Sequence, residues 1–232
     1  MEQVHTAPLL DVYAAAIPPD LEVGSVCSPA REQLLRETAA PALKRQRYFV
    51  WHLLEYAAQH SLGLDPEALA FEKRPEGRWV CPDFFFSLSH TEDAVVAAVS
   101  RSPVGVDVES LPIFARRFAS KPEHCTDLLR RIAAPEELTG CDGREAETLL
   151  RLWTGKESLF KFRQKSGFVP AETICGAKTR HLLLDLPPRM CLAVSSEALP
   201  ALRLLRFADE SAAPIEALPF SDLSDSLRRE TK

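Results

Sequence analysis

Two acidic side chains, Asp107 and Glu109, stand two residues apart in the apolar segment VGVDVE (104–109). Side chains alternate along a strand, so a strand here would place both carboxylates on the same face. A third carboxylate, Glu157, occurs in the segment WTGKESLFKF (153–162). Three carboxylates that meet at one point repel one another, and a hard divalent cation removes that repulsion. The pattern predicts a metal site in which Asp107, Glu109 and Glu157 bind magnesium, with manganese as an alternative ion.

Basic side chains accompany these acids and indicate a phosphorylated substrate. Lys161 follows Glu157 by one helical turn and shares its face, while Lys156 lies about 100° around the same helix. His90 ends an earlier strand-like segment. Further cations in the first half of the chain are Lys44, Arg45, Lys73, Arg74 and Arg78. Because magnesium often takes ligands from a substrate's phosphates, the acids and cations together predict a metal–diphosphate site.

The elements that must position these residues begin with three short strand-like segments. They are FFFSLSH (84–90), DAVVAAVS (93–100) and VGVDVE (104–109). The short connections between them favour an antiparallel up-down-up meander. In such a meander the first and third strands run the same way, so His90 and Glu109 would lie at the same edge of the sheet.

Long helices are predicted on both sides of this meander. A short helix begins at Ser28 and Pro29, and longer ones follow at 41–63 and 144–164. Three further strands are expected at 181–186, 189–197 and 201–207. Each half of the chain therefore runs from a long helix into three strands. We predict an α+β fold made of two similar subdomains in pseudo-twofold tandem, each a long helix packed on a small, mainly antiparallel sheet. The halves would be 1–110 and 111–232, with the active site at their junction.

Composition narrows the class of protein. The chain has 232 residues, 46% of them hydrophobic and 26% charged, as in a globular enzyme, and its net charge of −5 argues against nucleic-acid binding driven by overall charge. Its N-terminus lacks the pattern of a secretory signal, and no apolar run approaches the roughly 18 residues needed to cross a bilayer. The six cysteines do not have zinc-site spacing. We therefore expect a cytoplasmic protein with reduced thiols and no membrane contact.

Three motifs together give the sequence a specific resemblance. FSLSHT (86–91), VGVDVE (104–109) and RLWTGKESLFK (151–161) occur in this order. The chain resembles the 4′-phosphopantetheinyl transferases, in particular the larger class with two similar halves in one chain. The resemblance implies that the protein moves the phosphopantetheine arm of coenzyme A to a serine of an apo acyl or peptidyl carrier protein. The by-product would be adenosine 3′,5′-bisphosphate.

The resemblance also assigns roles to individual residues. Asp107, Glu109 and Glu157 match the family's magnesium ligands, and Glu157 is also our candidate to accept the proton of the carrier serine, directly or through water. Lys161 matches a lysine that contacts the diphosphate. The predicted coenzyme A contacts are Lys44, Arg45, Lys73, Arg78, Ser89, His90, Asp107, Lys156 and Lys161.

Three further points involve a departure from the family or an open choice. The loop EKRPEGRWV (72–80) resembles a family loop that ends in Gly-Lys-Pro, with Arg78 in place of the lysine and Trp79 in place of the proline. His90 contacts phosphate or acts as a general base, with phosphate contact favoured. An additional family acid falls at Glu136 or Glu123, with Glu136 preferred.

The carrier protein needs a docking surface, and the segment LPIFARRFASK (111–121) supplies apolar and basic side chains for one. The alternative interpretation of this segment is a linker helix that packs on the core, and the sequence favours neither. For the whole chain the rival functions are a magnesium-dependent hydrolase of coenzyme A or a nucleotide diphosphate, and a binding module without catalysis. A third is that the acids form only salt bridges, such as Glu157 with Lys161. Because one chain would build its own site, we expect a monomer.

Overall fold

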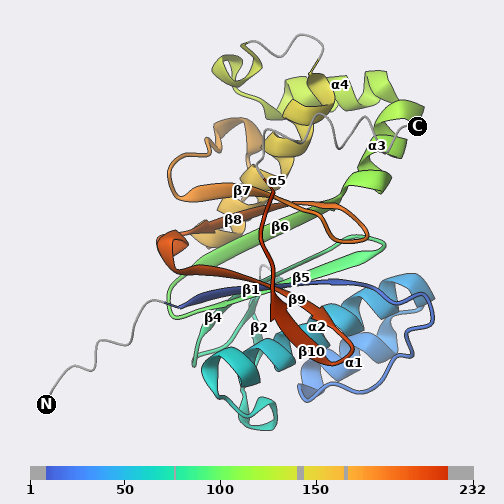
Figure 1. The fold of residues 1–232 in the computed structure, drawn as a ribbon, viewed down its shortest axis with the longest axis vertical. Helices are drawn as coiled ribbons and strands as arrows, with labels where there is room; N and C mark the ends of the chain where they lie inside the picture. The colour runs from blue at the N-terminus through green and yellow to red at the C-terminus, as the bar shows by residue number, and fades with distance from the viewer. Residues whose placement is uncertain (1–8, 76, 140–143, 165–166, 219–232) are drawn as a thin grey trace, which may run out of the picture.

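The computed structural model describes residues 9–75, 77–139, 144–164 and 167–218. The described chain forms a mixed α+β fold in which two β-sheets are stacked between two groups of helices (Figure 1). The helices are α1 (Pro29–Glu37), α2 (Pro41–Leu62), α3 (Leu111–Ser120), α4 (Pro122–Ile132) and α5 (Glu145–Arg163). The strands are β1 (Leu10–Ala16), β2 (Glu72–Lys73), β3 (Trp79–Val80), β4 (Phe85–His90), β5 (Ala94–Ser100), β6 (Val104–Ser110), β7 (Thr179–Leu184), β8 (Met190–Ser196), β9 (Leu202–Ala208) and β10 (Ser211–Pro214).

The larger sheet has the strand order β10-β9-β1-β5-β4, and the smaller one has the order β6-β8-β7. A separate two-stranded ribbon pairs β2 with β3. In the larger sheet β1 is antiparallel to β5 and parallel to β9, while β5 is antiparallel to β4. In the smaller sheet both pairings are antiparallel.

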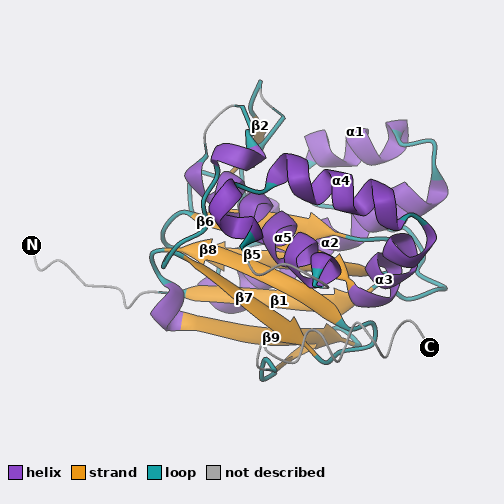
Figure 2. Cartoon of the chain, turned by 90° about the horizontal axis from the view of Figure 1, so that it is seen from above, coloured by secondary structure: helices purple, strands orange, loops and turns teal. Residues whose placement is uncertain are grey.

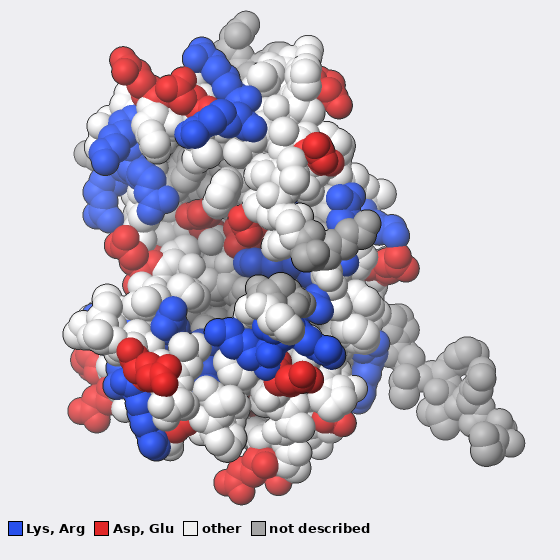
Figure 3. Space-filling model, turned by 180° about the vertical axis from the view of Figure 1, so that it is seen from behind, with Lys and Arg blue, Asp and Glu red and all other residues white. Residues whose placement is uncertain are grey.

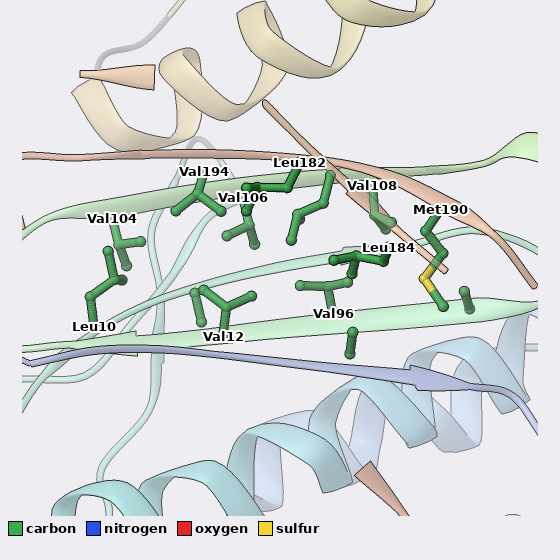
Figure 4. Close-up of a cluster of buried hydrophobic side chains, with 14 of the residues drawn as sticks. Leu10, Val12, Val96, Val104, Val106, Val108, Leu182, Leu184, Met190 and Val194 are labelled. Carbon is green, nitrogen blue, oxygen red and sulfur yellow. The ribbon is translucent and has the colours of Figure 1, made fainter. Parts of the chain in front are cut away.

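The inner faces of the two sheets meet in a continuous apolar core. Figure 4 shows Leu10, Val12 and Val96 of the larger sheet facing Val106 and other aliphatic side chains of the smaller one. Helix α2 covers the outer face of the larger sheet, and α5, α3 and α4 cover the smaller sheet (Figure 2). Burial of aliphatic surface on both faces of each sheet drives this layered arrangement.

The predicted helices are confirmed, and local chemistry accounts for their ends. Helix α1 begins after Ser28, whose hydroxyl accepts a hydrogen bond from the Arg31 amide. Helix α2 begins at a proline and ends at Gly63, which has a left-handed backbone with φ of 67°. Helix α5 spans 145–163 against the predicted 144–164.

The predicted meander is wrong in its third strand. Strand β6 does not pair with β5; it pairs with β8 in the other sheet. Both edges of β5 are already occupied, because β4 lies on one side and β1 on the other. Strand β1 was not predicted at all. It is an alanine-rich segment buried along most of its length, so it lacks both a strong strand preference and the alternation of a half-exposed strand.

Strands β4 and β6 nevertheless lie side by side and run in the same direction. The Ser87 hydroxyl accepts a hydrogen bond from the Val106 amide at 3.0 Å, and the Ser89 hydroxyl accepts one from the Val108 amide at 3.3 Å. Side-chain oxygens thus take the place of a backbone ladder where the two sheets meet. The prediction that the ends of these strands share one edge is therefore confirmed, although the pairing behind it was wrong.

The order of elements also differs from the predicted helix followed by three strands. Each unit is a strand, a long helix and two strands: β1, α2, β4 and β5 in the first, and β6, α5, β7 and β8 in the second. Strand pairing crosses the proposed boundary at residue 110, because β6 joins β8 while β9 and β10 join β1. The division into halves at that residue stays a prediction.

Candidate functional site

Asp107 is the point at which the three sequence motifs meet. Its carboxylate oxygen Oδ1 accepts hydrogen bonds from the Ser89 hydroxyl and the Lys161 ammonium, each at 2.8 Å. Ser89 comes from β4, Asp107 from β6 and Lys161 from α5, so three elements converge on one carboxylate. Lys161 Nζ also donates to the Val106 carbonyl at 3.0 Å, which holds the lysine against the strand.

Helix α5 packs closely enough on β6 to bring Lys161 to Asp107 because position 105 of the strand is a glycine. A Cβ added at Gly105 would lie 2.0 Å from the Ser158 carbonyl oxygen and 2.5 Å from the Phe162 amide nitrogen. The Ser158 hydroxyl donates to the Gly105 carbonyl at 3.1 Å and fastens helix to strand. The backbone of α5 thus fills the space that the absent side chain of Gly105 leaves.

The other two acids of the predicted trio lie in an unfavourable electrostatic environment. The pKa of Glu109 is raised to about 7, chiefly by burial and then by the charge of Asp107, while Arg117 and Lys161 act in the lowering direction. Burial and Asp107 also raise the pKa of Glu157, against a lowering effect of Lys161. Three carboxylates therefore disfavour one another's charge, and Lys161 relieves the repulsion only in part.

The donor chemistry of this trio fits a hard cation, since it offers carboxylate oxygens and neither thiol nor imidazole. Among the residues that the structure describes, however, no group of three or more His, Cys, Asp or Glu side chains is already arranged to hold a metal ion. The trio is thus a set of interacting acids with one lysine among them. Figure 3 shows acidic and basic side chains meeting along the hollow between the upper and lower layers.

A group of cations extends the site on the other side of Asp107. His90 is exposed at the end of β4, and partial desolvation together with the charges of Lys161, Arg31 and Arg47 lowers its pKa. Arg31 comes from α1 and Arg47 from α2, and sequence reasoning selected neither as a contact. The placement of Arg31 beside His90 depends on how α1 packs on α2, which has no local signal in the sequence.

Arg31 is unusual because it is buried without an acidic partner. Only 6% of the residue is exposed, and its guanidinium donates to the Arg47 carbonyl at 2.9 Å. Its Nε has no hydrogen-bond partner in the described part of the chain, and burial lowers its pKa to about 10. The guanidinium stays charged at neutral pH, and with Arg47 and His90 it forms a site suited to an anion.

A cavity of about 590 Å³ opens next to these groups. Its wall combines cations with aromatic rings, as a nucleotide-sized ligand would require. The wall includes Arg74, Arg78, Trp79, Phe86, Phe160 and Lys161. Lys161 therefore belongs both to the cavity and to the cluster around Asp107.

Comparison with known proteins agrees with this geometry. Residues 103–179, which include β6 and α5, match the family model described as the 4′-phosphopantetheinyl transferase superfamily. This part of the chain is therefore similar to that superfamily. The chain is 35% identical over 120 residues to 4′-phosphopantetheinyl transferase psf-1 of Bacillus pumilus, with 49% of this chain and 47% of the relative covered.

Two other relatives show similar identity over a similar part of the chain. A 4′-phosphopantetheinyl transferase of Bacillus subtilis is 27% identical over 144 residues, covering 58% of this chain and 60% of the relative. The 4′-phosphopantetheinyl transferase Sfp of Bacillus subtilis strain 168 is 29% identical over 117 residues, covering 47% and 48%. The chain thus spans less than two thirds of the length of each of these relatives. In the described ranges, no helix is long and apolar enough to cross a bilayer.

The superfamily's motif helix contains a second lysine, Lys156, which the structure places away from the acids. Its side chain is fully buried, and its ammonium donates to Glu137 at 2.6 Å and to the Pro170 carbonyl at 3.0 Å. These contacts favour a structural role for Lys156, and its contact with coenzyme A stays a prediction. The acid that pairs with Lys156 is Glu137, whereas the preferred candidate Glu136 is exposed and Glu123 lies in the first turn of α4.

The remaining predicted contacts lie at the edges of the site. Arg45 donates to the Pro19 carbonyl at 3.3 Å, and Lys44 is half-buried in the first turns of α2. Lys73 is exposed on β2, whereas Arg78 lines the cavity. The structure thus brings together Ser89, Asp107 and Lys161 by direct contact, and leaves the roles of Lys44, Arg45 and Lys73 as predictions.

Proposed function

We propose that this protein is a 4′-phosphopantetheinyl transferase that loads an apo acyl or peptidyl carrier protein from coenzyme A. The observation that carries the proposal is the convergence of Ser89 and Asp107 on Lys161, which also lines a nucleotide-sized cavity. The superfamily match over 103–179 and the names of the similar proteins support it. Loading a carrier would make the chain an enzyme with two substrates, one of them a protein.

In this proposal Asp107, Glu109 and Glu157 would hold magnesium. The bound ion would neutralise negative charge on the diphosphate of coenzyme A. The raised pKa values of Glu109 and Glu157 support the assignment, because burial and the charge of Asp107 raise them and a bound cation would oppose both effects.

The chain's own residues then divide the work of transfer. The carrier serine attacks the phosphorus that bears the pantetheine, and the bond to the adenosine 5′-phosphate oxygen breaks, releasing adenosine 3′,5′-bisphosphate. Glu157 accepts the serine proton, directly or through water. Lys161 donates to phosphate oxygens and stabilises the charge that develops on the leaving group. His90, Arg31 and Arg47 bind phosphate, and the cavity beside Arg78 takes the nucleotide.

We also propose that the two halves are related by a pseudo-twofold axis. The sheet order in each unit supports this relation, because the first strand pairs with the third and the third with the second in both. Since residues of both halves meet at Asp107, a single chain could complete the site, which supports a monomer.

Helix α3 is our proposed docking surface for the carrier. Leu111, Phe114 and Ala115 are buried, so one face of this helix packs on the core, as the alternative interpretation predicted. Arg116 and Arg117 remain exposed, and Arg117 is close enough to Glu109 to lower its pKa. An acidic carrier bound to these arginines would bring its serine near the acids.

Incubation with coenzyme A, magnesium and a panel of apo carriers, followed by mass spectrometry, tests the proposal. Loading of one phosphopantetheine per carrier, with release of adenosine 3′,5′-bisphosphate, is the expected result. Breakdown of coenzyme A without a modified carrier would instead establish a hydrolase. Binding of coenzyme A with no chemical change against any carrier would indicate a non-catalytic module.

A further inference from the structure

Arg31, the buried arginine of the cation group, lies over two tryptophan rings that also pack against each other. Its guanidinium carbon lies 4.9 Å from the centroid of Trp51 and 5.9 Å from that of Trp79. The two rings pack edge to face with centroids 5.2 Å apart. Trp51 lies on α2 one turn after Arg47, whose carbonyl accepts from Arg31.

The two rings differ in how they are themselves held. Trp51 is completely buried in the core of the first unit, so its position is set by packing. Trp79 is half-buried on the short strand β3, and it also lines the 590 Å³ cavity. One residue therefore contacts the arginine and borders the predicted nucleotide site.

Arg31 depends on such contacts because no carboxylate compensates its burial. The only hydrogen-bond acceptor of its guanidinium in the described chain is a backbone carbonyl, and Arg47 adds a second positive charge nearby. Stacking on aromatic faces offsets part of the cost of desolvating a guanidinium while leaving its hydrogen-bond donors free for an anion. An acidic partner in the same place would occupy those donors.

We propose that Trp79 is a positioning residue that holds Arg31 in the orientation that binds a phosphate of coenzyme A. The inference rests on the proposed function, since it takes coenzyme A as the ligand. It also gives a physical reason for a tryptophan at the place where the family loop has a proline. The aromatic ring links the loop over the cavity to the arginine on α1.

The proposal predicts a particular pattern of kinetic effects for Trp79→Leu. The KM for coenzyme A and its dissociation constant should rise about 3- to 30-fold, as expected for loss of one cation–π contact. The kcat and the KM for the carrier should change much less, because the lost contact acts on the binding of coenzyme A. Trp79→Phe keeps an aromatic face and should restore most of the affinity.

A double-mutant cycle with Arg31→Met separates positioning from a simple role in the cavity wall. If Trp79 acts through Arg31, Trp79→Leu should have no further effect on coenzyme A affinity once Arg31→Met is present. The inference would be overturned if Trp79→Leu lowered coenzyme A affinity by the same factor with Arg31 and with Arg31→Met. It would also be overturned if Trp79→Leu alone kept wild-type affinity. Trp79→Met, which is flexible and apolar, replaces the leucine variant in the cycle if that variant unfolds.

The same measurements keep the two proposals apart. Wild-type protein that binds coenzyme A by calorimetry but loads no carrier would reject the transferase function while leaving the cycle measurable through binding. Wild-type protein that binds no coenzyme A would overturn both. Normal transfer with an additive cycle would reject only the role of Trp79.

Discussion

Substitution of Gly105 by alanine should separate helix α5 from strand β6, because only a glycine permits their close approach. The new Cβ would lie 2.0 Å from the Ser158 carbonyl oxygen, 2.5 Å from the Phe162 nitrogen and 3.1 Å from the Phe162 Cα. All three are backbone atoms of α5, so no side-chain rotation can remove the clash. The backbone of Gly105 is not left-handed, and the effect would come from this contact alone.

The size of the effect follows from the distances. An ordinary Cβ contact begins at 3.4 Å, so the shortest contact requires a relative movement of 3.4 − 2.0 = 1.4 Å. Overpacking of a core by one methyl group typically costs about 1–3 kcal/mol, and contact with backbone places this case at the upper end. For a chain of this length, about 3 kcal/mol lowers Tm by roughly 6–12 °C.

The rate of transfer should be affected more strongly than the free energy of unfolding. The same movement would stretch the bond between Lys161 and Asp107, now 2.8 Å, and shift Glu157 relative to Glu109. Misplacement of reacting groups by about 1 Å costs on the order of 100-fold in rate. We therefore expect a large loss of kcat in protein that is still folded at 25 °C.

Thermal unfolding and the carrier-loading assay measure the two effects. Gly176→Ala is the matched control, because Gly176 is exposed, is not in the left-handed region, and would place its new Cβ more than 4 Å from any heavy atom outside its own chain neighbours. It should change stability by no more than about 0.5 kcal/mol. If Gly105→Ala unfolded at the same temperature as this control and kept its transfer rate, our account of how α5 is positioned would be refuted.

Four further outcomes are expected. Glu109→Ala should lower transfer at least about 100-fold in saturating magnesium with little change in Tm, and wild-type rates would reject it as a metal ligand. Lys156→Met should lower the free energy of unfolding by about 3–5 kcal/mol in urea titrations, since it leaves a buried acid unpaired, yet leave the KM for coenzyme A unchanged. Charge reversal of both Arg116 and Arg117 should raise the carrier KM without altering coenzyme A affinity, and an unchanged KM would exclude α3 as the docking surface. Burial lowers the pKa of His181 to about 4, below its unfolded value near 6.5, so the unfolded chain takes up a proton first as pH falls and stability drops. Between pH 7 and pH 5 this group should account for up to about 2 kcal/mol of lost stability, which His181→Gln should remove in urea titrations at the two values.

Much of the site could be predicted because its residues belong to short motifs with local periodicity. The alternation of VGVDVE predicted that Asp107 and Glu109 share one face of a strand, and in the structure Asp107 contacts α5 while Val106 and Val108 lie in the core. The four-residue spacing of Glu157 and Lys161 correctly placed both on one side of a helix. These relations depend only on the pitch of a strand or a helix.

Choices among partners at long range could not be predicted in the same way. Lys156 and Lys161 both lie on α5, yet one is buried against Glu137 and the other contacts Asp107. Spacing along a helix gives the angle between two side chains, but not which neighbour each will meet. Arg31 was missed for the same reason, because its environment comes from α2 and β3 and not from its own segment.

The sequence by itself determined where the long helices α2 and α5 lie and that Asp107 and Glu109 share one face of a strand, since these depend on residues that are neighbours in the chain. Only the tertiary structure decided that β6 joins β8 and that serine hydroxyls join it to β4. It also decided that α5 rests on Gly105. Those outcomes depend on which edges and surfaces remain free once the whole core has packed, and that competition involves residues far apart in the chain.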